Sequence, residues 1–282
     1  FEQIATLGDN ISGETKPEAA RLAAARGRYI RSIGAIEERF AQAKGGPDQV
    51  AYESFDKAIG LDPNVAEYYV GRGLTYQDLL EPTPDKKAEV LRENAKLVEQ
   101  HAENDDQRNI ARGLDALATY QESNWVPDYP TKRTKLAQAV AELTAVNAKA
   151  AQSTSQYHDI YHALRVVEGG GYLHLANYAD DKSEKEKFLA TAKESVQALI
   201  KDDENRVHPE WAILLLGNIE EDEGMFLKKF ESYDSALKQF TSALEISQQD
   251  NDPKSQSLAL LGRGRCRMRQ AIHASKDDAE RR

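Results

Sequence analysis

Apolar side chains recur along the chain at intervals of three and four residues, and polar side chains fill most positions between them. Because an α-helix has about 3.6 residues per turn, this spacing gathers the apolar side chains on one helical face. Proline and glycine mark the places where helices end. We predict first helices of successive pairs at 17–43, 65–80, 105–121, 154–168, 208–229 and 255–274, and second helices at 48–60, 84–103, 131–151, 183–201 and 232–249.

A small, a bulky and a small residue, spaced by four and then three, share one helical face in two places. Glycine also stands repeatedly inside the apolar helical pattern, although it costs about 1 kcal/mol there relative to alanine. We therefore expect other helices to cross closely at these positions. The triplets are Ala51, Phe55, Ala58 and Ala236, Phe240, Ala243, the glycines include Gly27, Gly73, Gly113, Gly217 and Gly262 or Gly264, and the expected core contains Ala51, Phe55, Tyr69, Tyr76, Ala236 and Phe240.

These residues resemble the tetratricopeptide repeat (TPR) family. Residues 51–77 are similar to the junction of two such repeats, and residues 231–246, ESYDSALKQFTSALEI, are similar to the second helix of another. The resemblance implies an all-α fold in which helix-turn-helix pairs stack into a right-handed α-α superhelix. The glycine intervals here, 46, 40 and 47 residues, exceed the family's usual repeat of about 34.

The interval predicts five to six helix pairs in one continuous domain over residues 17–282, after an irregular leader at 1–16. The last pair lacks a second helix, so we expect either a longer parent chain or a charged C-terminal cap. The chain also begins at Phe1 without a basic-then-apolar leader, so we expect a processed form or a fragment of a longer protein, and its compartment, cytoplasmic or exported, stays open.

Charge and hydropathy restrict the classes of partner. The chain has 37 basic and 47 acidic residues and a net charge of −10, which disfavours nucleic acid and anionic membranes. The longest apolar run, Trp211–Leu216, is far shorter than the ~20 residues of a membrane span, so none is expected. The single cysteine, Cys266, cannot form an internal disulfide.

The resemblance implies a non-catalytic interaction module that binds a peptide or protein along its first helices, on the concave face. Acidic residues at both ends of this face predict a basic, partly apolar partner. The alternative for each apolar residue is plain core packing. The residues projected onto the face are Glu67, Val70, Leu74, Gln77, Asp78, Gln107, Ile110, Leu114, Leu117, Trp211, Leu214 and Asn218, with Glu221 and Asp222 beside the last of them.

Two histidines four residues apart, His158 and His162, could lie on one helical face and reach a metal ion, with His174 twelve residues further on. An aspartate stands where the zinc-peptidase pattern has glutamate, and no third ligand is evident. We therefore expect no metal, no cofactor and no catalytic residue, with an enzyme site around these histidines as the alternative. The adjacent Gly169–Gly171 predicts a turn or a helix kink.

Other charged and aromatic groups leave alternatives open. The run Glu220–Glu223 is typical of a solvated helix face. The arginines at 263, 265, 267 and 269 predict a solvated terminal helix or, as the alternative, a contact with an anion or an acidic partner. The loop at 124–130 predicts rings that cover the adjoining hairpin or anchor a partner. A self-assembling scaffold, joined through the C-terminal helix, is a third possibility for the whole protein.

Overall fold

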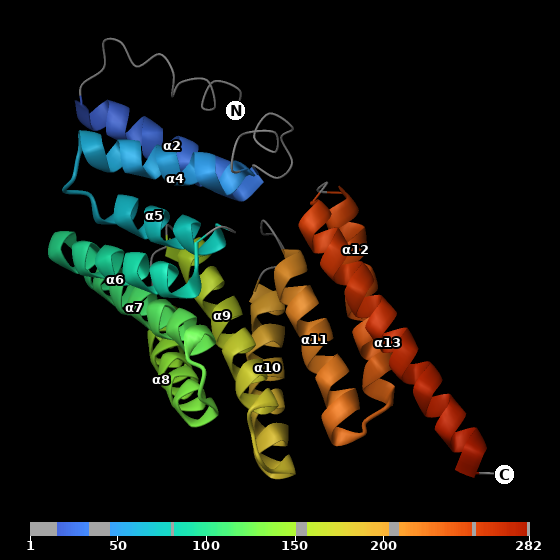
Figure 1. The fold of residues 1–282 in the computed structure, drawn as a ribbon. Helices are drawn as coiled ribbons and strands as arrows, with labels where there is room; N and C mark the ends of the chain where they lie inside the picture. Colours follow the sequence, from blue (N-terminus) through green and yellow to red (C-terminus); the bar gives the residue numbers. More distant parts are fainter. Residues whose placement is uncertain are drawn as a thin grey trace. The chain divides into compact units, whose positions relative to one another are not determined.

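The computed structural model describes residues 16–33, 46–79, 82–150, 157–202, 209–249 and 252–280. These residues form eleven α-helices and no strand (Figure 1). None of these helices is both long and apolar enough to cross a bilayer. The helices are α2 Lys16–Ile33, α4 Gly46–Leu61, α5 Ala66–Asp78, α6 Pro84–His101, α7 Asp105–Trp125, α8 Tyr129–Asn147, α9 His158–Asn177, α10 Lys182–Asp202, α11 Pro209–Leu227, α12 Glu231–Gln249 and α13 Pro253–Glu280.

The predicted helices are confirmed within a few residues at most ends, because polar caps mark where they begin. The side chain of Asn104 accepts a hydrogen bond from the backbone N–H of Gln107 at 2.9 Å, and Asp128 accepts one from Thr131 at 2.9 Å. Such caps satisfy backbone N–H groups that have no partner in the first turn of a helix. The expected leader at 1–16 and the end of the first predicted helix lie almost entirely outside the described residues.

The helix α9 departs from the prediction. It continues through Gly169–Gly171 to Asn177, so the expected turn is wrong. Packing explains the difference, because a Cβ at Gly169 would lie 2.6 Å from Val196 of α10. Close contact with a neighbouring helix therefore outweighs the weak helix propensity of glycine.

The chain divides into two compact units, 1–164 and 165–282. In unit 1 the helices α2, α4, α5, α6, α7 and α8 pack as successive neighbours (Figure 1). Phe55 of α4 is buried between two glycines, since a Cβ would lie 2.9 Å from its ring at Gly27 and 2.2 Å at Gly71. The glycines thus allow α2 and α5 to approach α4 closely.

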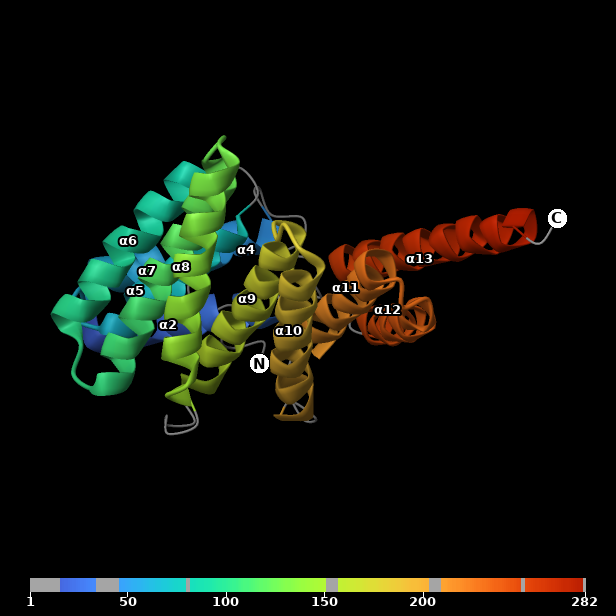
Figure 2. The ribbon, with the colours of Figure 1, turned by 90° about the horizontal axis from the view of Figure 1, so that it is seen from below.

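Unit 2 repeats this arrangement with α10, α11, α12 and α13 as successive neighbours. Phe240 of α12 is buried between Gly217 of α11 and Gly262 of α13, where a Cβ would lie 2.8 Å and 2.5 Å from its ring. Figure 2 shows α13 as a long final helix beside α11 and α12. The single domain expected over 17–282 stays a prediction.

The predicted core is confirmed for Ala51, Phe55, Tyr69, Ala236 and Phe240, which are all buried. Tyr76 is half-buried instead, and its ring lies 5.4 Å from the ring of Tyr52 on the preceding second helix. The repeated triplets therefore identify the packing layer between first and second helices.

Candidate functional site

The residues projected onto an exposed inner face are mostly core. The expected exposure is wrong for seven of them, because first helices pack against neighbours and use these positions in the core. Their role in binding a partner is a separate prediction. The buried residues are Val70, Leu74, Gln107, Ile110, Leu114, Leu117 and Leu214, whereas Glu67, Gln77, Trp211 and Asn218 are half-buried and the side chain of Asp78 lies outside the described residues.

The polar residues of this face in unit 1 bind one another. The Glu67 carboxylate accepts hydrogen bonds from Gln107 Nε2 at 2.6 Å and from the Tyr157 hydroxyl at 3.0 Å. Asn109 Nδ2 donates to the Tyr161 hydroxyl at 3.0 Å. These bonds tie α5 to α7, and α7 to the start of α9, so the polar groups are already engaged within the chain.

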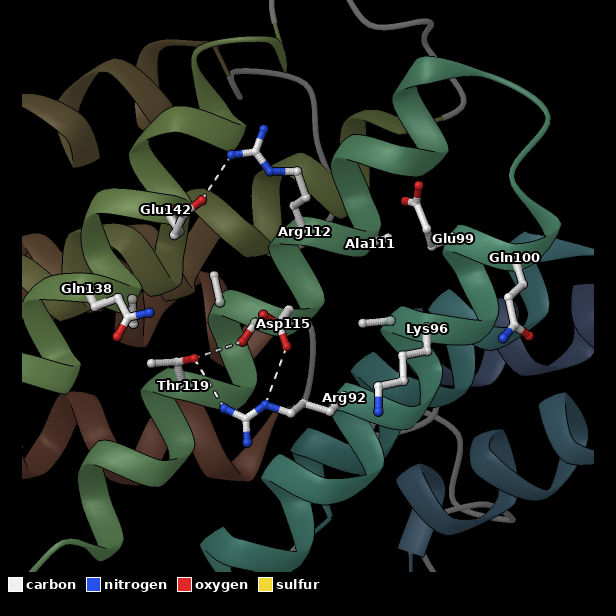
Figure 3. Close-up of a pocket in the computed structure, with 13 residues that line it drawn as sticks. Arg92, Lys96, Glu99, Gln100, Ala111, Arg112, Asp115, Thr119, Gln138 and Glu142 are labelled. Carbon is white, nitrogen blue, oxygen red and sulfur yellow. Dashed lines mark hydrogen bonds and ion pairs between the residues drawn. The ribbon is translucent and has the colours of Figure 1, made fainter.

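The opposite side of α7 borders an open groove of about 620 Å³ between α6, α7 and α8 (Figure 3). We call it the α6–α8 groove. Its floor contains small side chains, and long charged side chains form its walls. The alanines leave space that larger residues would fill. The floor residues are Ala95, Ala111, Ala116 and Ala139.

Two arginines in the groove are held by carboxylates of the same unit. Arg92 lies 3.4 Å from Asp115 and also pairs with Glu122. Arg112 Nη2 lies 3.0 Å from Glu142 (Figure 3). The hydrogen bond from Arg92, together with one from Lys135 at 2.7 Å, lowers the pKa of Glu122 to about 2. Both arginines therefore already have carboxylate partners within the unit.

Two further charged side chains of the groove, Lys96 and Glu99, project from α6 (Figure 3). Neither side chain has a hydrogen bond or ion pair within the described part of the chain. A neighbouring hollow of about 420 Å³ continues along α6 and adds four carboxylates, those of Asp85, Glu89, Glu93 and Glu122. Carboxylates thus outnumber basic groups over the two hollows together.

Sequence reasoning missed this groove because it lies largely on second helices, where no partner contact was expected. The signal that could have found it is the pairing of alanines with charged residues one turn apart. Ala95 with Glu99 on α6, and Ala111 with Asp115 on α7, show this pattern.

In unit 2 the acidic run on α11 is not the solvated face that was expected. Glu220, Glu221 and Glu223 are all buried. Arg265 of α13 binds Glu221 through Nε and Nη2 at 2.7–3.0 Å, and Arg269 lies 3.1 Å from the same carboxylate. Two of the four C-terminal arginines therefore pair with a carboxylate of the chain itself.

Burial controls the ionisation of two further groups beside this ion pair. Desolvation, followed by the charge of Glu221, raises the pKa of Asp222 to about 6. Desolvation also raises the pKa of the Cys266 thiol to about 12, so this thiol is not activated by its arginine neighbours. Asn218 accepts a hydrogen bond from Arg265 at 2.8 Å, which occupies another of the predicted contact residues.

The aromatic candidates differ in exposure. Trp211 is half-buried, with the Lys254 ammonium 4.9 Å from its ring centre. Trp125, at the end of α7, is 60% exposed, and Tyr129 at the start of α8 is 46% exposed. The rings of this loop therefore do not fully cover the adjoining hairpin.

The three histidines do not come together. His158 and His162 lie one turn apart, but His174 follows twelve residues later on the same continuous helix, about 18 Å along its axis. Within the described ranges, no group of three or more His, Cys, Asp or Glu side chains is placed to hold a metal ion. The alternative of one site formed by all three histidines is therefore wrong.

Comparison with known proteins supports the fold. The sequence matches no family model, and no curated protein sequence is similar enough to count as a relative. The structure is similar to the crystal structure of a thermophilic TPR protein from Thermus thermophilus, with a TM-score of 0.56 and 15% sequence identity. That match covers 88% of this chain and 98% of the other. The predicted all-α, TPR-like helical repeat fold is thereby confirmed.

Proposed function

We propose that the protein is a non-catalytic interaction scaffold whose α6–α8 groove binds a basic, partly apolar segment of a partner protein. The observation that carries the proposal is an open groove with an alanine floor and an excess of carboxylates. Helical repeat folds of this kind commonly present extended surfaces for binding. The fold alone does not fix a function, so the groove carries the argument.

The charges of the groove support a basic ligand. Arg92 and Arg112 already pair with carboxylates of the chain, so they offer little to an acidic ligand. Glu89 and Glu99 have no such pairing among the described residues, and Lys96 is the single unpaired base of the two hollows. A basic segment would form ion pairs with these carboxylates, and the net charge of −10 would speed its association.

The floor supports small apolar anchors between the charges. Ala95 and Ala139 are buried and border the groove from opposite helices. They leave a shallow space that suits methyl groups better than rings. The matching probe is a fluorescent peptide of alternating lysine and alanine, and a glutamate–alanine peptide serves as its counterpart.

Binding of the lysine–alanine peptide should be measured by fluorescence anisotropy at low and high salt. The double variant Glu89→Gln/Glu99→Gln should weaken binding at least fivefold at low salt, and less at high salt, because screening weakens exposed charge pairs. The control Glu194→Gln/Glu245→Gln removes the same charge from exposed positions on other helices and should change binding much less. Equal losses in both double variants would show that the peptide responds only to the net charge of the protein, and not to the groove.

Occupation of the groove can be tested without changing charge. Gln138→Trp fills the groove from an exposed wall position, whereas Ala137→Trp places the same ring on α8 outside it. Only the first should block the peptide. If Glu67→Gln abolished binding while Gln138→Trp left it intact, the face of the first helices would be the site and the groove proposal would fail.

A further inference from the structure

Two first helices carry the same tripeptide, Gly-Arg-Gly. It occupies Gly71–Gly73 in α5 and Gly262–Gly264 in α13. The first glycine makes the same contact in both helices, since it receives the ring of the preceding second helix, Phe55 or Phe240. The helix α5 therefore serves as an internal template for α13.

The two helices differ at the second glycine of the tripeptide. A Cβ at Gly73 would lie 3.3 Å from Asn94 of the following helix, α6. At Gly264 no atom of the described residues would lie within 4 Å of such a Cβ. The position that α6 occupies on α5 is thus open on α13.

The arginine between the glycines shows the same difference. Arg72 Nε donates to Asn94 Oδ1 at 2.9 Å, and Arg72 Nη2 lies 3.8 Å from Glu93. Arg263, its counterpart on α13, has no hydrogen bond or ion pair within the described ranges. Within this part of the chain Arg263 therefore lacks the two partners that α6 supplies to Arg72, and also a counterpart of Asp56 on α4, which lies 3.2 Å from Arg72 Nη1.

The flanking positions agree with this comparison. Tyr69 is 4% exposed and its ring stacks on His101 of α6, whereas the matching Leu260 is 55% exposed. At the other end, Lys87 of α6 donates to the backbone carbonyl of Gln77, and the matching Met268 is 58% exposed.

Residues of α6 therefore contact α5 at intervals of seven, running antiparallel to it. Lys87 meets the end of α5, Asn94 its centre and His101 its start. An interval of seven returns to the same face of a helix after two turns. On α13 the outer contact positions are leucine and methionine, so they favour apolar partners in place of lysine and histidine.

Charge also discriminates between occupants. Between Pro253 and His273 the helix α13 has basic residues and no acidic one. Arg265 and Arg269 are paired with Glu221, which leaves Arg263 and Arg267 beside the open face. A second copy of α13 would bring basic groups to basic groups, whereas an acidic helix would neutralise them.

We propose that the open face of α13 binds an amphipathic helix of a partner protein, antiparallel to α13, in the position that α6 holds on α5. The partner places a small polar residue over Gly264 and an acidic residue beside Arg263. It places apolar residues seven positions before and after, over Met268 and Leu260. This second interaction surface lies in unit 2 and is separate from the α6–α8 groove.

The test uses the full chain and a labelled synthetic peptide with the sequence of residues 84–101, carrying Lys87→Leu and His101→Leu to match the apolar ends of the α13 face. Binding is measured by fluorescence anisotropy. The peptide should bind, and Gly264→Phe should weaken it at least tenfold by blocking close approach. Gly60→Phe, at a glycine that is also exposed and without contacts near the end of α4, should leave binding unchanged.

A charge exchange tests the register. Arg263→Glu should weaken binding of the peptide, and a second peptide with Glu93→Lys should bind the Arg263→Glu protein better than the original protein. Absence of binding at 1 mM peptide, or equal binding to the Gly264→Phe variant, would overturn the proposal. So would sedimentation that shows a dimer of the chain converted to monomers by Gly264→Phe, because a second copy would then be the occupant.

Discussion

Glu122 in unit 1 and Asp222 in unit 2 both lie near arginines, yet their pKa values move in opposite directions. Hydrogen bonds from Arg92 and Lys135 lower the pKa of Glu122 to about 2. Burial raises the pKa of Asp222 to about 6, and the neighbouring arginines only partly oppose this because they pair with Glu221. An arginine that donates directly to a carboxylate therefore lowers its pKa more than arginines that act on it through charge alone.

One hydrophobic packing contact, by contrast, is the same in the two units. Each unit buries one phenylalanine of a second helix between glycines of the two adjacent first helices. The shared contact belongs to the repeat architecture, whereas the features that differ belong to the individual units. Close packing is common to both units, and the placement of charge is particular to each.

The largest expected effect comes from removing the shared packing contact. Phe55→Ala and Phe240→Ala should each lower the free energy of unfolding by about 3–5 kcal/mol, because each leaves a cavity at a site with little room to collapse. Urea unfolding followed by circular dichroism measures the loss, and hydrogen exchange should place it in the unit that carries the change. Leu260→Ala, at an exposed position, is the control and should change stability little. If only one of the two variants lost stability, the two contacts would not be equivalent.

The second effect concerns the half-buried carboxyl group of Asp222 in unit 2. A raised pKa means that the folded state binds the proton more tightly, so this contribution to stability is complete below pH 3.8 and is lost as the pH rises through about 6. Moving the pKa from 3.8 to about 6 corresponds to about 3 kcal/mol. Asp222→Asn should therefore stabilise the protein by up to about 3 kcal/mol at pH 8 and by nothing near pH 3.5. Urea titrations at both values measure it, and equal stabilisation at the two would exclude a role for ionisation.

Glu122 should show the opposite sign and a smaller effect. Its lowered pKa contributes stability that is present above pH 4.5 and is lost as the pH falls toward 2. Arg92 is 37% exposed, so solvent screening reduces the expected loss in Glu122→Gln to about 1–2 kcal/mol at pH 7. The stability difference between this variant and the parent protein should shrink below pH 4.5. A difference that persisted at pH 2 would point to lost packing rather than lost charge.

The sequence predicted most of the helices and the core, because both depend on local periodicity. Phe55 and Phe240 are identified by their small neighbours in the chain, and the structure buries both. The partner surface could not be predicted in this way. Whether Leu114 is exposed depends on which helices cover α7, and whether Glu221 is solvated depends on arginines more than forty residues away on α13. Both are tertiary contacts that leave no local pattern.

The smallest expected effect tests whether packing or helix propensity decides the course of α9. Gly170 and Gly169 are adjacent on this helix, but a Cβ would meet no described atom within 4 Å at Gly170 and would lie 2.6 Å from Val196 at Gly169. Gly170→Ala should therefore stabilise the protein by up to about 1 kcal/mol, since alanine is the better helix former. Gly169→Ala should destabilise it, because Val196 must move to admit the new methyl group. Thermal unfolding of the two variants side by side measures both signs. If both variants were stabilised, propensity rather than close packing against α10 would govern the triple glycine.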